Sequence, residues 1–263
     1  YGEPIPMITI REYVRPATLE EAWALSPETL VALDYSVVAE RFIEKVCAER
    51  GCKLYHADYA DVHPLSASLE GQRFDWKNLH DLSLPLLGEH QLHNAATVLE
   101  AVNVLREQGW DIDDEAVEAG LYSVAWPARF EVLHTDDPWF VLDGGHNPQC
   151  AAALRECLEH YFPDRKRVAL VGVLKDKDYK AIAATLAPLF DACVCVTPNS
   201  ERALPAGELA EFFRGSCREV SISDTVEDGV DLARDIAQEQ DAMVCAFGSL
   251  YICGQIRACF GLK

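Results

Sequence analysis

The sequence predicts an α/β fold, built around a mostly parallel sheet with helices on both faces. Short apolar runs alternate with helix-length segments over the second half of the chain. Apolar strands joined by helices form crossover units, whose parallel strands are buried on both faces. Before about residue 125 the pattern differs, because strand-like alternation precedes two helical segments. We therefore expect two domains, residues 1–125 and residues 126–263.

Local signals place the elements of the first domain. An apolar strand is expected within residues 1–10, and Ser26-Pro27 supplies an N-cap followed by proline at the first helical position. Gly51 is expected to end the next helix at its C′ position. Apolar periodicity predicts the remaining elements. They are helices at 36–50, 89–108 and 113–122, a strand at 53–57, and antiparallel strands within 68–86.

The second domain is expected to begin with a hairpin, in which strands at 130–134 and 139–143 flank a turn at 135–138. Strands and helices then alternate. The predicted strands are 167–173, 192–196, 219–222 and 242–247, and the predicted helices are 148–161, 180–190, 206–214, 226–238 and 250–260.

The chain is strongly acidic. Its 263 residues hold 23 Lys and Arg against 43 Asp and Glu, which gives a net charge of −20. Nucleic acids and anionic membrane surfaces bind clustered positive charge, so we expect neither as a partner. We also expect no membrane span and no signal peptide, because no long apolar stretch occurs and residues 1–10 lack a basic start.

Ten cysteines are present, and most lie inside apolar runs. Cys193 and Cys195 alternate with valines, which places both on one face of a predicted strand, and Cys245 and Cys253 have similar surroundings. A reduced cysteine packs there as a small hydrophobe. The sequence has no C-x-x-C pair, and structural zinc needs four converging ligands. We therefore expect buried reduced thiols, no metal site and a cytoplasmic protein.

Three loops follow predicted strands, at the carboxyl edge where doubly wound sheets bind ligands. In DGGHNP (143–148), two glycines and an Asn-Pro pair suit a capped turn, whereas Asp143 could accept hydrogen bonds from ribose hydroxyls. LKDKD (174–178) is either a solvated charged loop or part of a site. Gly248-Ser249 opens a helix, either as a plain N-cap or as an anion site.

Two further segments could face a cleft. GEHQLHN (88–94) opens the helix at 89–108, and PARFE (127–131) lies at the domain junction. Arg129 is either an ordinary surface charge or a clamp for a phosphate. The sequence contains no G-x-G-x-x-G, no G-x-x-x-x-G-K-[ST] and no G-x-S-x-G. It therefore lacks the fingerprints of a dinucleotide site, a P-loop and a hydrolase nucleophile.

These segments in this order resemble the folylpolyglutamate synthase / dihydrofolate synthase family, within the Mur ligase superfamily. The matching segments are GEHQLHNAATVLEAV, WPARFEVL, VLDGGHNP, VGVLKDKDY, TPNSERALPAGELAEFF and AFGSLYICGQIR. The likeness is strong over residues 82–263, whereas residues 1–81 match in layout alone. It implies that residues 1–125 are the end of a P-loop ATPase-type α/β domain. Residues 126–263 would be a Rossmann-like glutamate-ligase domain of the Mur type.

The resemblance also implies an activity. Family members use ATP to phosphorylate a carboxylate of a folate or pteroate substrate, and the amine of L-glutamate then attacks the acyl phosphate. Asn94 would contact the adenine side of ATP, Arg129 a phosphate, and Asp143 the ribose. His146, as the catalytic candidate, and Ser249 would line the side where glutamate enters.

The family's P-loop, Mg²⁺ ligands and pteridine-binding loop have no counterpart in these residues. We therefore expect the chain to be an incomplete piece of a monomeric ligase, inactive by itself, whose Mg²⁺ ligands lie mostly upstream. Two alternatives remain open. One is a Mur-type peptidoglycan or other amino-acid ligase, and the other is a non-catalytic nucleotide-binding module. An upstream glycine-rich loop ending in Gly-Lys-[Ser/Thr] would distinguish a piece of a ligase from the module.

Overall fold

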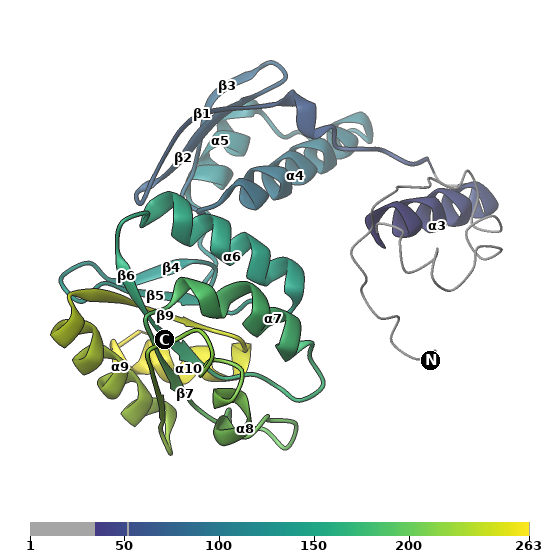
Figure 1. Cartoon of the computed structure of the whole chain (residues 1–263). Coiled ribbons are helices and arrows are strands. Elements are labelled where there is room, and N and C mark those ends of the chain that lie inside the picture. Colours follow the sequence, from purple (N-terminus) through teal and green to yellow (C-terminus); the bar gives the residue numbers. More distant parts are fainter. Residues whose placement is uncertain (1–34, 52, 263) are drawn as a thin grey trace. The chain divides into compact units, whose positions relative to one another are not determined.

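The structure is a computed structural model that describes residues 35–51 and 53–262 (Figure 1). The strand expected within residues 1–10 and the helix expected at Ser26-Pro27 lie outside these residues. The chain divides into two compact units, and the division falls between His56 and Ala57. The domain boundary expected at residue 125 lies within the second unit and stays a prediction.

The described part of the first unit contains helix α3, Tyr35–Arg50, which confirms the helix predicted at 36–50. Gly51 follows with a φ of +66°, the left-handed conformation expected after a helix. The strand predicted at 53–57 was wrong, because these residues form no regular element. None of the described strands pairs with this segment, and short apolar–polar alternation alone does not supply the hydrogen-bonding partner that a strand needs.

A three-stranded antiparallel sheet opens the second unit, in the order β1-β2-β3. The strands are β1 Val62–Ser68, β2 Gly71–Trp76 and β3 Leu79–Leu84. The β2–β3 pair confirms the prediction of antiparallel strands within 68–86. Strand β1 was missed, because its side chains are mostly exposed and it contains Pro64, next to which its register with β2 shifts.

A short 3-10 turn, η1 (Tyr59–Asp61), precedes β1, and two helices that follow β3 pack on this small sheet. Helices α4 (Glu89–Glu107) and α5 (Asp114–Tyr122) confirm both predicted helices. Asp113 caps α5, since its side chain accepts the N–H of Ala116 at 2.7 Å. The shared core contains aromatic side chains of β2 and leucines of β3 and α4. Its members include Phe74, Trp76, Leu82, Leu84, Leu92 and Leu99.

A six-stranded sheet forms the rest of the second unit, in the order β4-β5-β9-β6-β7-β8. The pair β4–β5 is the predicted antiparallel hairpin, and the other neighbouring pairs are parallel. This arrangement confirms the predicted mostly parallel sheet. The strands are β4 Glu131–His134, β5 Phe140–Asp143, β6 Lys166–Val171, β7 Ala192–Cys195, β8 Glu219–Ile222 and β9 Ala242–Phe247.

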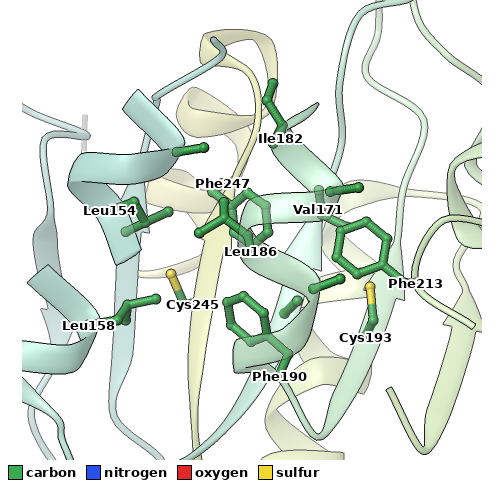
Figure 2. Packing of buried hydrophobic residues seen from close by; sticks show 14 of the residues in the cluster. Leu154, Leu158, Val171, Ile182, Leu186, Phe190, Cys193, Phe213, Cys245 and Phe247 are labelled. Atoms are coloured by element: carbon green, nitrogen blue, oxygen red, sulfur yellow. The ribbon is translucent and has the colours of Figure 1, made fainter. Parts of the chain in front are cut away.

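Helices cover both faces of this sheet (Figure 1). They are α6 Pro148–Tyr161, α7 Tyr179–Leu186, α8 Ala206–Ala210, α9 Val226–Gln240 and α10 Leu250–Cys259. One core gathers side chains of α6, α7 and α8, and the other gathers those of α9 and α10. Figure 2 shows the first core, where Leu154, Ile182 and Phe213 pack toward the strands.

Two helices end earlier than predicted, each for a local reason. Helix α7 gives way to a 3-10 turn, η2 (Ala187–Leu189), because Pro188 has no N–H to continue the α-helical pattern. After α8, the N–H groups of Phe212 and Phe213 bond three residues back instead of four. This tightening places Phe213 fully inside the core.

The four cysteines predicted to be buried in apolar surroundings are buried. Cys193, Cys195 and Cys245 are fully enclosed in strands, and Cys253 is 5% exposed in α10. Burial raises the pKa of the Cys253 thiol to about 12, so the thiol stays protonated at neutral pH. Among the described residues, no helix is both long enough and apolar enough to cross a membrane.

Candidate functional site

The carboxyl edge of the six-stranded sheet brings the predicted loops together. Asp143, at the end of β5, pairs with Phe247 at the end of β9, and Val171 of β6 pairs with Phe247 from the other side. The loops that follow these three strands therefore begin side by side. This is the position at which parallel α/β sheets bind ligands.

Asp143 is fixed by its own backbone surroundings. Its Oδ1 accepts the N–H of Gly145 at 2.7 Å, and its Oδ2 accepts the N–H of Phe130 at 2.9 Å. Burial raises the pKa of this carboxyl, while the two backbone hydrogen bonds and the nearby Arg129 charge lower it in part. Each oxygen can accept a second hydrogen bond, so the group keeps acceptor capacity toward a ligand.

The turn after β5 is the capped turn that the sequence indicates. The Asn147 side chain accepts the N–H of Cys150 at 2.8 Å, and Pro148 occupies the first turn of α6. Gly145 is required at its position, because a Cβ there would lie 2.6 Å from Oδ1 of Asp143. The Asp143 carboxylate can therefore approach the backbone of Gly145 closely only because this residue has no side chain.

Arg129 lies in the turn that leads into β4. The residues on either side of it, Ala128 and Phe130, have positive φ values of +56° and +45° and are buried. The carbonyl of Ala128 accepts the N–H of Gly144 at 2.8 Å, which joins this turn to the loop after β5. Arg129 and Asp143 are thus held on two connected turns.

The third contribution comes from the first turns of α4. Asn94 donates from Nδ2 to Oε1 of Gln91 at 3.0 Å, and His90 lies one residue before Gln91. Burial lowers the pKa of His90, while the charge of Asp143 acts in the opposite direction. The start of α4 therefore presents two amides beside an imidazole whose neutral form is favoured.

A pocket of about 290 Å³ gathers these groups. Asn94, Arg129 and Asp143, which the family resemblance assigns to one ligand, all line it. The other lining residues come from the start of α4 and from one face of α6: His90, Gln91, Gln149, Cys150, Ala153, Leu154 and Cys157. A guanidinium, three amides and a carboxylate in one pocket suit a ligand that carries a phosphate, a heterocyclic base and hydroxyl groups.

A larger, mainly apolar groove of about 670 Å³ shares Gln91, Asn94 and Arg129 with this pocket. Side chains of α4 and α5 form most of its wall, including Val98, which is 54% exposed. The pocket that holds Asp143 therefore continues into this apolar groove, and Gln91 and Asn94 lie where the two join.

His146 and Ser249 do not line the pocket. The Nδ1 atom of His146 lies 3.1 Å from the carbonyl oxygen of Gly144. Ser249 is 2% exposed, and its Oγ accepts the N–H of Tyr251 at 3.2 Å, which makes it the N-cap of α10. Both lie on the carboxyl edge, but their contact with a second substrate stays a prediction.

The loop after β6, at 174–178, is tied to the loop after β7. The guanidinium of Arg202 donates to Asp176 at 2.8 Å and to the hydroxyl of Tyr251 at 3.4 Å. The N–H of Lys175 donates to the carbonyl of Arg202 at 2.8 Å. This loop is thus held at the surface by one ion pair and one backbone hydrogen bond.

Sequence reasoning missed the contribution of α6. Gln149, Cys150, Leu154 and Cys157 recur at helical spacing on one side of α6, and this periodicity could have marked them. Within the described part of the chain, no group of three or more His, Cys, Asp or Glu side chains is placed to hold a metal ion.

Comparison with known proteins identifies this arrangement. Residues 128–250 match the family model of the Mur ligase glutamate ligase domain. The chain is 36% identical over 197 residues to the dihydrofolate synthase/folylpolyglutamate synthase of Mycobacterium tuberculosis, over 69% of this chain and 40% of that protein. The chain belongs to the folylpolyglutamate synthase/dihydrofolate synthase family. The family predicted from the sequence motifs is thereby confirmed.

Further relatives agree with the family assignment. The folylpolyglutamate synthase of Lacticaseibacillus casei is 31% identical over 193 residues, which cover 71% of this chain and 43% of that protein. The Mycobacterium tuberculosis folylpolyglutamate synthase complexed with ADP and AMPPCP superposes with a TM-score of 0.77 at 29% identity. That match covers 87% of this chain and 54% of the other. The chain thus spans about half the length of the family members it matches.

A second solved structure contains both a nucleotide and a metal ion. The bifunctional folylpolyglutamate synthase/dihydrofolate synthase from Yersinia pestis, complexed with AMPPNP and a Mn ion, has a TM-score of 0.66 at 28% identity. The match covers 84% of this chain and 50% of that protein. Family members of this fold are therefore found with adenine nucleotides and with a divalent metal.

Proposed function

We propose that this chain provides the nucleotide-binding face of an ATP-dependent ligase that adds L-glutamate to a carboxylate of a folate or dihydropteroate. The observation that carries the proposal is the meeting of Asn94, Arg129 and Asp143 in one pocket. These residues come from three separate segments, and the family assignment supplies adenine nucleotides as the ligand class.

Each side chain suits one part of the nucleotide. Arg129 offers a planar guanidinium for phosphate oxygens. Asn94 lies where this pocket meets the apolar groove, so its amide can bond the edge of a base that rests on apolar side chains. Asp143 accepts ribose hydroxyls with the lone pairs that its two backbone partners leave free.

The reaction has two steps. A carboxylate oxygen of the pteridine substrate attacks the γ-phosphorus of ATP, and ADP leaves. The glutamate amine then attacks the acyl carbon, the C–O bond to phosphate breaks, and the amine nitrogen loses a proton as the amide forms. In this chain, Arg129 would bind and orient the nucleotide for the first step, while His146 and Ser249 are proposed for the glutamate side.

A divalent ion such as Mg²⁺ would neutralise phosphate charge when bound. Asp143 is the one acidic side chain that lines the pocket, and backbone groups already engage both its oxygens. The described residues thus fit the sugar and base of the nucleotide better than they fit a metal. We further propose that the ligase acts as a cytoplasmic monomer, which the reduced buried thiols support as far as the compartment is concerned.

The proposal can be tested by titrating the 263-residue chain with ADP and following amide chemical shifts by NMR, which detects weak binding. Arg129→Ala should weaken ADP binding about 10- to 150-fold, since hydrogen bonds to charged groups contribute roughly 1.5–3 kcal/mol. Arg155→Ala is the matched control, because Arg155 is an exposed arginine on α6 that pairs with Glu159. If both variants bind ADP like the wild type, the nucleotide assignment is wrong.

The same preparation should incorporate no glutamate into a reduced folate in the presence of ATP. The sequence has no P-loop lysine or glycine-rich nest to hold the β- and γ-phosphates. Turnover above a blank without enzyme would show that these residues contain a complete ligase centre.

A further inference from the structure

We propose that Glu131 and Arg257 are positioning residues, which hold the backbone of Arg129 in the conformation that presents its guanidinium to a nucleotide phosphate. The proposal rests on the function proposed above, because it takes Arg129 to be the phosphate ligand. Neither Glu131 nor Arg257 lines the nucleotide pocket, so both would act through Arg129.

The turn around Arg129 needs such support. Ala128 and Phe130 both adopt positive φ, a region that side chains with a Cβ occupy rarely, and Phe130 is bulky. Strained backbone of this kind persists where surrounding contacts over-determine it, and it gathers at ligand sites. Both residues are anchored in cores, Phe130 on one face of the sheet and Ala128 on the other.

Three hydrogen bonds hold the backbone of the turn. The carbonyl of Ala128 accepts the N–H of Gly144, and the N–H of Phe130 reaches Asp143, as described above. The third bond joins the N–H of Ala128 to Oε2 of Glu131 at 2.8 Å. The carboxylates of Glu131 and Asp143 therefore bind the backbone of the turn on either side of Arg129. Of the two, only Asp143 also lines the pocket.

Arg257 holds the second carboxylate in place. Its Nη1 donates to Oε1 of Glu131, so the two oxygens of Glu131 have separate tasks. The side chains of Arg257 and Glu131 are 13% and 24% exposed, which limits the competition from water. Arg257 lies on α10, whose N-cap is Ser249, so the ion pair also joins the Arg129 turn to the C-terminal helix.

The arrangement predicts which property of the site each substitution changes. Arg257→Met leaves Glu131 without this counter-charge, and Glu131→Ala removes the acceptor of the Ala128 N–H. Either change frees the turn, and the guanidinium of Arg129 then samples positions away from the phosphate. Binding of the phosphate part should weaken, whereas contacts to the nucleoside part, which Asn94 and Asp143 make, should remain.

The experiment compares ADP with adenosine on the 263-residue chain by NMR titration. Arg257→Met and Glu131→Ala should each weaken ADP binding about tenfold, the ratio that corresponds to about 1.4 kcal/mol, and change adenosine binding less than about twofold. Arg257→Lys keeps the charge with a simpler donor and should return ADP binding to within about threefold of the wild type. Glu131→Gln keeps an acceptor for Ala128 and should therefore stay closer to the wild type than Glu131→Ala. If the alanine variant does not fold, Arg257→Met alone tests the proposal.

Arg167→Met is the matched control. Arg167 is an arginine of 8% exposure near the start of β6, at the opposite edge of the sheet, and it donates to the carbonyls of Leu158 and Phe162. Its loss should lower stability and leave the ratio of ADP to adenosine affinity unchanged.

The outcomes separate this proposal from the function on which it rests. If Arg129→Ala weakens ADP binding while the folded Glu131 and Arg257 variants keep the wild-type ratio, the positioning role is wrong and the nucleotide assignment stands. Equal weakening of ADP and adenosine would also overturn the positioning role, since it would indicate a general disturbance of the pocket. If Arg129→Ala itself binds ADP normally, the function proposed for Arg129 fails first.

Discussion

The two sheets in the described residues differ in how far their apolar surfaces are covered. In the six-stranded sheet, helices cover both faces, and the strands β5, β7 and β9 are buried along their whole length. In the three-stranded sheet, α4 and α5 cover one face, and strand β1 is largely exposed. Beside that core, the walls of α4 and α5 leave an apolar groove open.

The difference shows where binding capacity arises. The closed sheet supplies rigid strand ends that fix Asp143 and the loops beside it. The more open region supplies the start of α4 with Gln91 and Asn94. The candidate nucleotide pocket lies where these two regions meet. The closed sheet thus carries Asp143, whose two carboxylate oxygens are fixed by backbone hydrogen bonds, and the more open region carries the amides of Gln91 and Asn94.

The largest effect is expected from the closed region. Phe213→Ala should lower the free energy of unfolding by about 3–5 kcal/mol, because Phe213 is fully buried among the helices of the first core. Phe212→Ala is the matched control, because the ring of Phe212 is only partly buried and packs against that core from outside. Urea denaturation followed by circular dichroism measures both. A loss below about 1 kcal/mol for Phe213→Ala would mean that this core is not tightly packed.

A middle-sized effect is expected at the edge of the closed region. Ser249→Ala should cost about 1 kcal/mol of unfolding free energy, because it removes the N-cap of α10. Thermal denaturation measures this loss. In the complete ligase, a raised KM for glutamate with unchanged KM values for ATP and folate would add a substrate contact to the cap. An unchanged KM for glutamate would leave the cap as the role of Ser249.

The smallest effect is expected in the groove. Val98→Ala should change the free energy of unfolding by less than about 0.5 kcal/mol, because Val98 is 54% exposed and alanine favours a helix. Leu92→Ala on the same helix is the contrasting variant. Leu92 is 3% exposed, and its truncation should cost about 2–5 kcal/mol. If the Val98 variant lost as much as the Leu92 variant, the groove would be part of a closed core and the contrast would disappear.

The sequence was sufficient where local chemistry decides the structure. Asn147 and Ser249 each cap the helix that their position indicates, and strands β8 and β9 have the predicted bounds. The strand predictions were wrong where the local sequence pattern did not match the presence of a pairing strand. The segment 53–57 alternates like a strand but has no partner among the described strands, whereas β1 has a partner and a poor pattern.

The candidate site divides in the same way. Asp143 and Arg129 could be named from the sequence, because a strand end and a domain junction are recognisable positions and the family motifs contain them. The residues of α6 that line the pocket were not found, because a helix face has no direction until the helix packs. The roles of Asp143 and Arg129 toward the nucleotide stay predictions.

From residue 35 onward, apart from β1 and the segment 53–57, the sequence by itself determined the order of strands and helices, the caps at Asn147 and Ser249, and the family. These follow from periodicity and from motifs that are contiguous in the chain. The tertiary structure alone decided which side chains meet. Glu131 and Arg257 are 126 positions apart, and Asn94 and Asp143 lie on different elements. Such contacts depend on the order of the strands in the sheet. In that order β9 lies between β5 and β6, although β9 is the last strand in the sequence. No local pattern encodes that placement, because it results from burying the apolar faces of all the strands together.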